Sequence, residues 1–431
     1  MIYNILLLAL LVEFMVGIKN PKNSLGIAVV IILLIPSAIK FSIGVNLNSF
    51  NLSMLVFIFL LIPVCFKYSP LYPRIRKPFV WYTIYVFVSS LIVSVGFIPM
   101  SEYIQNMVLF LFEYSIVAYV MCWIKFDDSE IRKFNNVLLL VSIIIILYSL
   151  ICYVTKINVY MAYINIVSDV STDMSEKFMQ EQRGILDGRV SGTFGHPLQL
   201  GQCVLLLFSY FFFEHSGKKI FSSIFLLGLF VTAILTGSRS SLVPIFLVIL
   251  INLFSYKKKE ILLRCVVALV SISITFPLLP NKTQDFVKGS VLFWDDKAAS
   301  KADINGSSFG DRKGQLSAAF SHIDDSFLLG KGFNFHVKHG EEYSDDVYGY
   351  ESIFLSHTID GGILGTLAFL LFYYQLYRQL LKRCCKNIGR LRVHSLCLPF
   401  FVSMSLTGIS YSMFCFFLIL YMMTLYRVQM K

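Results

Sequence analysis

The stretch Glu351-Ser352-Ile353-Phe354-Leu355 marks a sharp boundary in the sequence. Before it lies a long polar segment, residues 281–351, and after it an apolar run continues to about residue 376. The polar segment holds charged, aromatic and glycine residues at a density that a helix facing lipid does not tolerate. We therefore expect this segment to lie outside the bilayer and to form part of a binding or reactive loop.

The composition around this boundary is that of a membrane protein. Of 431 residues, 56% are hydrophobic and only 15% are charged, and the mean hydropathy of +0.71 is far from that of a soluble domain. A membrane-spanning helix needs about 20 apolar residues, and the polar stretches are too short for a separate soluble catalytic domain. The sequence therefore predicts an all-α polytopic membrane protein with residues 1–431 in a single integral membrane domain.

The apolar runs indicate how many helices to expect. They cover residues 2–18, 25–42, 51–66, 78–97, 105–124, 134–155, 197–213, 219–236, 241–254, 261–279, 353–376, 394–409 and 411–426. The last two could belong to one broken or re-entrant helix, so we predict 12 or 13 transmembrane helices. The first run lacks a basic leader and a small-residue cleavage site, so we expect it to be retained.

The basic residues predict the orientation. They gather in every second link between consecutive apolar runs. In chain order these links contain Lys19 and Lys22; Lys67, Arg74, Arg76 and Lys77; Lys125, Arg132 and Lys133; Lys218 and Lys219; Lys257, Lys258 and Lys259; and Arg378, Lys382, Arg383, Lys386, Arg390 and Arg392. The positive-inside rule assigns these links to the cytoplasm. We therefore expect the amino terminus and two long loops, residues 156–196 and 280–352, to face outward.

The net charge of +11 does not indicate nucleic acid binding, because the cations lie in these short links. The segment 281–351 itself has twelve acidic residues against eight lysines and arginines. A loop with that balance is poorly suited to nucleic acid and better suited to a neutral or polar substrate.

Three arginines lie at the outward edge of apolar runs, against the positive-inside bias: Arg189, Arg239 and Arg312. A planar guanidinium suits a phosphate or pyrophosphate, whereas the alternative for each is a snorkelling or helix-capping side chain. Arg239 follows Gly237 and Ser238 in a short turn, where backbone and hydroxyl donors could also bind an anion.

The other polar candidates each have two interpretations. His196, before Pro197 at a helix start, could act as a base or donor, or could merely close the loop onto that helix. Glu351 could be a general base toward a sugar hydroxyl, or a carboxylate placed at a helix amino terminus.

The apolar run after Glu351 contains His357 and Asp360, which are candidates because ionisable residues inside a membrane helix are often functional. The neighbouring Gly361, Gly362 and Gly365 suggest close helix contact. The outward histidines have irregular spacing and no cysteine accompanies them, so we expect neither a metal site nor a cofactor.

Several motifs occur in an order that resembles a known family. They are Gly192-Thr193-Phe194-Gly195-His196-Pro197 with Gly201, then Thr236-Gly237-Ser238-Arg239-Ser240, then Arg312 with Ala318-Ala319-Phe320 and Leu329-Gly330-Lys331-Gly332, and last Glu351-Ser352 with Gly361-Gly362-Ile363-Leu364-Gly365. Over residues 185–370 the chain resembles the O-antigen polymerase and O-antigen ligase superfamily. Ligases of that family are similar but carry a histidine, typically followed by Asn or Ser, where this chain has Glu351-Ser352, which favours a polymerase.

The resemblance implies a metal-independent glycosyltransferase with a GT-C-like fold in the bacterial inner membrane, its active site facing the periplasm. It implies an undecaprenyl-diphosphate-linked oligosaccharide as donor and a chain-length regulator as a possible partner. In this interpretation Arg312 and Glu351 are catalytic, and Arg189, His196, Ser238 and Arg239 bind diphosphate or glycan. The alternatives are a ligase that transfers the finished glycan to lipid A core or protein and, in another class, a flippase or other transporter, whose expected internal symmetry is not visible.

Overall fold

The structure is a computed structural model of an all-α, multi-pass membrane protein, and about 82% of the residues it describes are helical. It describes residues 2–37, 39–43, 45–168, 179–180, 182–183, 186–213, 219–253, 281, 284–285, 288, 309–324, 326–338, 350–408 and 410–430. Two antiparallel hairpins accompany the helices, formed by β1 (Lys40–Ile43) with β2 (Val45–Asn48) and by β3 (Gln182–Arg183) with β4 (Leu186–Asp187).

Most of the helices follow the predicted apolar runs, whereas the helices at 159–168, 309–323 and 335–338 lie within the predicted outward loops. In the first part of the chain they are α1 (Ile2–Lys19), α2 (Pro21–Leu34), α3 (Ser49–Lys67), α4 (Pro73–Phe97), α5 (Met100–Phe110), the π-helix η1 (Leu111–Ser115), α6 (Ile116–Met121), α7 (Asp128–Thr155) and α8 (Val159–Ser168). In the second part they are α10 (Pro197–Phe211), α11 (Lys219–Leu235), α12 (Arg239–Leu253), α16 (Phe309–Ile323), α17 (Phe335–Lys338), α18 (Ile353–Leu381), α19 (Asn387–Thr407) and α20 (Tyr411–Met430).

Two predicted runs need comment. The run 261–279 lies outside the described residues. The run 25–42 is helical only to Leu34, because Pro36 disfavours helical backbone at the residue before it, and β1 begins at Lys40.

Four helical stretches are long and apolar enough to cross a membrane, by length and composition: Ser49–Lys67, Met100–Met121, Asp128–Thr155 and Ile353–Leu381. Five shorter apolar helices accompany them among the described residues. The total of 12 or 13 spans therefore stays a prediction.

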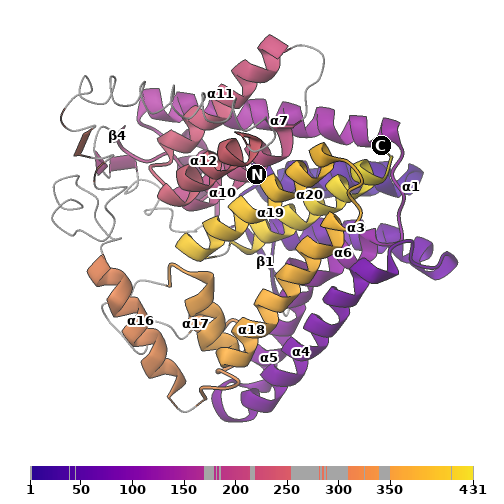
Figure 1. The fold of residues 1–431 in the computed structure, drawn as a ribbon, viewed down its shortest axis with the longest axis vertical. Helices are drawn as coiled ribbons and strands as arrows, with labels where there is room; N and C mark the ends of the chain where they lie inside the picture. Colours follow the sequence, from indigo (N-terminus) through magenta and orange to yellow (C-terminus); the bar gives the residue numbers. More distant parts are fainter. Residues whose placement is uncertain are drawn as a thin grey trace.

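The centre of the bundle is α20. Every residue from Met413 to Tyr426 is buried, as expected for a helix that is apolar on all sides. Figure 1 shows α20 next to α19. Its tyrosines pair with backbone carbonyls of neighbouring helices, Tyr421 with Leu376 at 2.9 Å and Tyr426 with Met121 at 2.7 Å. These bonds satisfy the buried hydroxyls and fix α20 against α18 and α6.

Polar contacts join the basic links at one end of the bundle. They connect Lys22 with Glu130, Leu71 with Cys122, and Arg392 with Phe213. Links that contain predicted cytoplasmic cations thus meet at one end, which we call the basic end. Lys218 and Lys257 to Lys259 lie outside the described residues, and the side of the membrane that the basic end faces stays a prediction.

Helix α18 is broken. Gly362 has φ 64° and ψ −165°, which divides α18 into residues 353–361 and 362–381. The two halves fold back on each other, since the hydroxyl oxygens of Thr358 and Thr366 are 3.0 Å apart. In a straight helix, residues eight positions apart are about 12 Å apart along the axis.

The loop before α17 supplies the hydrogen bonds that this break removes. The pairs are Lys331 N–H to the Ile359 carbonyl (2.9 Å), Gly332 to Asp360 (2.8 Å), Ile363 to Phe327 (3.0 Å) and Leu364 to Leu328 (3.2 Å). A Cβ atom on Gly362 would lie 2.4 Å from the carbonyl carbon of Leu328. Only glycine permits this approach of two backbones at this positive φ.

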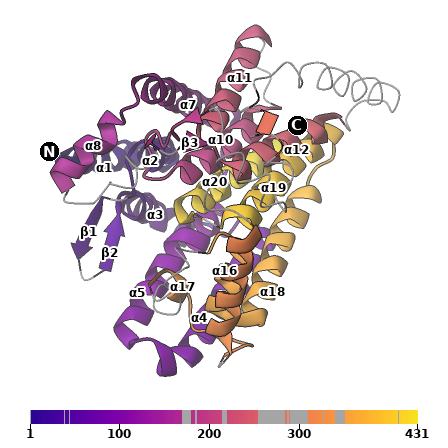
Figure 2. The same cartoon turned by 90° about the vertical axis from the view of Figure 1, so that its left-hand side faces the viewer.

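The sequence suggested that the apolar run 353–376 is one straight span. The structure shows instead that this run is broken at Gly362. Its first half runs back beside the second, and Phe354 and Tyr373 both contact the ring of Phe401. Helix α16 packs against α18 (Figure 2). Phe354, three residues after Glu351, consequently lies near Tyr373 in the second half of α18.

Candidate functional site

Two predicted arginines meet at the turn between α11 and α12, residues 236–241, which we call the arginine turn. Arg189 is only 3% exposed, and its Nε donates to the carbonyl of Thr236 at 3.0 Å. Arg239 is half-buried and forms the first residue of α12. Arg189 therefore caps the carboxyl end of α11, as its alternative interpretation proposed, and this contact positions the turn that carries Arg239.

Hydroxyl groups order the arginine turn from within. Gly237 has φ 60°, and the Ser238 N–H donates to Thr236 Oγ1 at 3.2 Å. The Ser238 and Ser240 hydroxyl oxygens are 2.7 Å apart, and Ser241 Oγ donates to the Ser238 carbonyl at 2.9 Å. The turn thus fixes several dipoles at the amino terminus of α12, where the helix favours an anion.

Helix α10 starts beside the arginine turn. His196 is its N-cap residue, with Nδ1 accepting from the Leu198 N–H at 3.0 Å, so capping accounts for one ring nitrogen. Further along, a Cβ atom on Gly201 would lie 3.1 Å from the Cβ of Ser241. Gly201 therefore brings the α10 backbone close to the arginine turn.

The next residue, Gln202, connects α10 to a second group of elements. Its Nε2 donates to the carbonyl of Gly408, the residue that ends α19, at 3.0 Å. A Cβ atom on Gly408 would lie 3.2 Å from the carbonyl oxygen of Tyr350 and 3.8 Å from the nitrogen of Ser352. Gln202 thus links α10 with the segment that contains Glu351.

Glu351 is half-buried and lies one residue before the helix cap. Ser352 is the N-cap of α18, and its Oγ accepts from the Phe354 N–H at 3.3 Å. The N-cap hydrogen bond is therefore made by Ser352, while Glu351 stands at the amino terminus of α18, where the helix dipole favours a carboxylate. Burial raises the pKa of the neighbouring Tyr350 to about 12, so that this phenol stays protonated near neutral pH.

Helix α16 brings Arg312 toward this segment. The Glu351 N–H donates to Gln315 Oε1 at 3.0 Å, and Arg312 lies three residues before Gln315 in the same helix. The two α16 positions are one helical turn apart. The structure describes the backbone of Arg312 but not its side chain.

Asp360 has a structural role that the sequence did not reveal. Its carboxylate accepts hydrogen bonds from the Asn334 N–H (2.8 Å) and the His336 N–H (3.0 Å), and its Oδ2 is 2.9 Å from His336 Nδ1. Asn334 has a positive φ of 69°. Asp360 therefore holds the loop before α17 in place, and its carboxylate accepts from all three of these donors.

The glycines near Asp360 differ from one another. Gly362 has the backbone approach described above, and a Cβ atom on Gly365 would be in ordinary contact with the His357 carbonyl at 3.6 Å. A Cβ atom on Gly361 would meet nothing within 4 Å, so close helix contact does not explain why a glycine stands at this position. His357 is buried, with its ring 4.3 Å from that of Phe369 between centroids.

The predicted residues therefore form one group around α10. Arg189, His196, Ser238 and Arg239 surround its amino-terminal turns, and Gln202 connects these turns to the segment of Glu351 and α16. Sequence reasoning missed Gln202 and Gln315. Gln202 could have been found as a polar residue directly after Gly201 within an apolar run, whereas nothing distinguishes Gln315. In the described part of the chain, no three His, Cys, Asp or Glu side chains gather as a metal site would require.

One comparison with known families finds a match. Residues 224–370 match the family model described as O-antigen ligase. The chain therefore carries a domain of the O-antigen polymerase and ligase superfamily. The match includes Ser238, Arg239, Arg312 and Glu351, whereas Arg189 and His196 precede it. No curated protein matches the chain.

Proposed function

We propose that this protein is a surface-polysaccharide polymerase. It joins undecaprenyl-diphosphate-linked repeat units by metal-independent, inverting glycosyl transfer on the outward face of the bacterial inner membrane. The family match supports a polymerase or a ligase. The observation that carries the proposal is the arrangement around α10, where Gly201 packs against the arginine turn and Gln202 reaches the turn beside Glu351.

The arginine turn is the proposed site for the donor diphosphate. Arg239 stands at the amino terminus of α12, so its guanidinium and the helix dipole would act on the same anion. Arg189 holds the turn through Thr236, and Ser238 adds a hydroxyl donor. Fixed positive charge at this point stabilises the negative charge that develops on the departing lipid diphosphate.

Glu351 is the proposed general base. Its carboxylate accepts the proton of a hydroxyl on the acceptor repeat unit as that oxygen attacks the anomeric carbon of the growing chain. The bond from the anomeric carbon to the diphosphate oxygen breaks, and the electron pair leaves with the lipid diphosphate. One direct displacement of this kind inverts the anomeric configuration. Arg312 acts with Glu351 from the neighbouring helix α16.

The alternative is a ligase that transfers the finished glycan to lipid A core or to a protein. The matching family model carries the description O-antigen ligase and is compatible with both functions. The pair Glu351-Ser352 supports a polymerase, because the similar ligases carry a histidine at the first position. A polymerase of this kind would also work with a chain-length regulator.

The two functions leave different products in a strain from which the gene is deleted. Loss of a polymerase leaves core lipid with a single repeat unit, whereas loss of a ligase leaves long polymer on undecaprenyl diphosphate. We expect the first result in a gel of the lipid-linked and surface glycans. Long polymer on the lipid carrier would instead identify a ligase. Unchanged glycans in every fraction would contradict both functions.

A further inference from the structure

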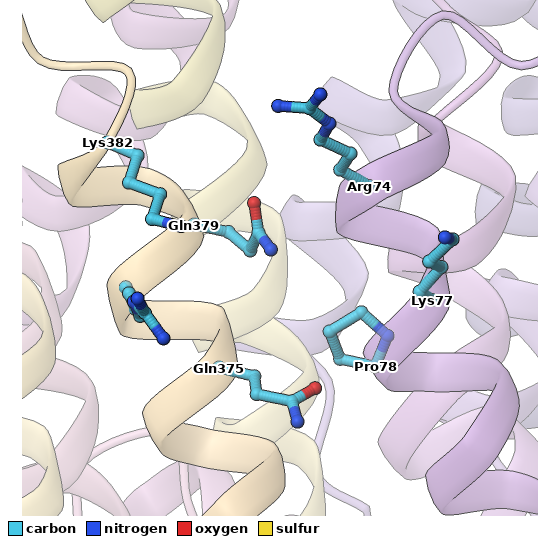
Figure 3. Close-up of a pocket in the computed structure, with 7 residues that line it drawn as sticks. Arg74, Lys77, Pro78, Gln375, Gln379 and Lys382 are labelled. Carbon is cyan, nitrogen blue, oxygen red and sulfur yellow. The ribbon is translucent and has the colours of Figure 1, made fainter.

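A pocket lies between the start of α4 and the end of α18, at the basic end of the bundle. It has a volume of about 390 Å³ and is lined by Arg74, Lys77, Pro78, Gln375, Arg378, Gln379 and Lys382. Figure 3 shows Arg74 and Pro78 on α4 opposite Gln379 and Lys382 on α18. Its lining therefore contains four cations and two amides, and no carboxylate.

The four cations of the pocket lack acidic partners in the part of the chain that the structure describes. Among the described residues, Arg74, Lys77, Arg378 and Lys382 form no ion pair and no side-chain hydrogen bond. All four are exposed, so their charges are available to a ligand. Four like charges around one pocket repel one another, and a bound anion would offset this repulsion.

Ordinary roles of cations explain only part of this arrangement. Arg378 and Lys382 stand at the carboxyl end of α18, where the helix dipole favours positive charge. Arg74 and Lys77 stand in the first turns of α4, where the same dipole disfavours it. The positive-inside bias accounts for basic residues at this end but not for their gathering from two helices around one pocket.

The pocket is closed toward the middle of the bundle. Trp81 Nε1 donates to Gln375 Oε1 at 2.9 Å, which ties α4 to α18 one turn inside the pocket. Pro78 is buried beside this bond. A ligand in the pocket therefore has its charged group at the basic end and cannot pass inward between the helices at this level.

An exposed apolar track continues from the pocket along both helices. On α4 the residues Val80, Ile84 and Val88 are exposed and share a face with Lys77, at spacings of three and four residues. On α18 the exposed Leu367, Leu371 and Tyr374 share a face with Arg378 in the same way. A molecule with a charged head and two apolar chains would match the pocket and the two halves of this track.

We propose that this pocket binds an anionic phospholipid, with the phosphate among the four cations and the acyl chains along the apolar track. Basic pockets between helices at the cytoplasmic surface have the chemistry that recognises phospholipid head groups. The pocket lies at the opposite end of α18 from the break at Gly362, and it contains none of the proposed donor or acceptor residues. The proposal therefore does not depend on the proposed function.

The test compares lipid binding by purified full-length protein. Native mass spectrometry and thermal unfolding in detergent are measured with added phosphatidylglycerol, phosphatidylcholine or inorganic phosphate. We expect phosphatidylglycerol to bind and to raise the unfolding temperature, and the other two to have little effect. A pocket variant that carries Lys77→Gln, Arg378→Gln and Lys382→Gln should bind phosphatidylglycerol between about tenfold and a hundredfold more weakly.

The matched control removes three exposed lysines at the same end but outside the pocket, through Lys67→Gln, Lys125→Gln and Lys133→Gln. Both triple variants lose the same net charge, so equal weakening would show diffuse surface attraction and overturn the proposal. Stabilisation by inorganic phosphate that the pocket variant alone loses would show a simple anion site and overturn the lipid assignment. Equal binding of phosphatidylcholine would also overturn it, because that lipid carries no net charge.

Discussion

Two glycines with positive φ, Gly237 and Gly362, each interrupt an apolar helical stretch, and both belong to motifs that resemble one family. At Gly362 the backbone groups that the break leaves unpaired within the helix bond to the loop before α17, and the Asp360 carboxylate accepts from three donors. At Gly237 the turn instead presents the half-buried Arg239 at a helix amino terminus. Similar glycine motifs therefore have different surroundings: the break at Gly362 pairs with a distant loop, whereas the turn at Gly237 is ordered by its own hydroxyl groups.

The largest effect is expected from Gly362→Ala. The new Cβ would have to occupy a positive φ and would lie 2.4 Å from the Leu328 backbone, which cannot move aside as a side chain can. We expect the free energy of unfolding to fall by roughly 3 to 5 kcal/mol, from backbone strain and overpacking together. Thermal unfolding of purified protein and its yield in membranes would measure this loss.

The adjacent Gly361 provides the matched control. A Cβ atom there meets nothing within 4 Å, so Gly361→Ala should change the free energy of unfolding by less than about 0.5 kcal/mol. Equal losses in the two variants would show that the break tolerates no side chain anywhere and that the approach to Leu328 is not the cause.

The second prediction concerns the two proposed site arginines, Arg239 in the arginine turn and Arg312 in α16. Arg239→Ala and Arg312→Ala should each reduce glycan elongation by on the order of a hundredfold or more, because each removes a charge proposed to stabilise the transition state. Arg239→Lys should recover only part of the activity, since lysine lacks the planar fork. Elongation is measured as polymer length on gels from a complemented deletion strain, with the thermal unfolding of each purified variant alongside.

Arg132→Ala is the control for charge loss. This exposed arginine lies at the basic end, and among the described residues it bonds only its own helix, with Nε donating to the Asp128 carbonyl at 3.1 Å. The strain that carries Arg132→Ala should produce polymer of normal length. If Arg239→Ala lowered the unfolding temperature as much as Gly362→Ala does, the arginine turn would be a structural element like the break in α18.

The sequence predicted much of the fold, because a strong apolar pattern determines where membrane helices form. It did not predict the break in α18, since Gly361 and Gly362 look alike in the sequence and only the distant loop around Leu328 distinguishes them. Local pattern also carries no information about pairings between residues far apart, such as Gln202 with Gly408.

The candidate site was predicted unevenly for the same reason. Arginines at the outward edge of apolar runs stand out against the positive-inside bias, and the structure places Arg189 and Arg239 at one turn. The sequence could not separate capping from binding, because both use the same side chains. The structure assigns capping to Ser352 and a carbonyl contact to Arg189, while the roles of Arg239 and Glu351 in catalysis stay predictions.

The smallest effect is expected at Asp360. Its carboxylate accepts from the Asn334 N–H, the His336 N–H and the His336 ring, whereas the amide in Asp360→Asn has only one oxygen. One buried backbone donor would lose its acceptor, which costs about 1 to 3 kcal/mol. His336→Ala removes only the ring contact, so it should lower the unfolding temperature less than Asp360→Asn does. The opposite ranking would mean that Asp360 serves mainly to hold the His336 ring and not the backbone of the loop. The Asp360–His336 pair near Gly362 would then be a polar group comparable to the arginine turn.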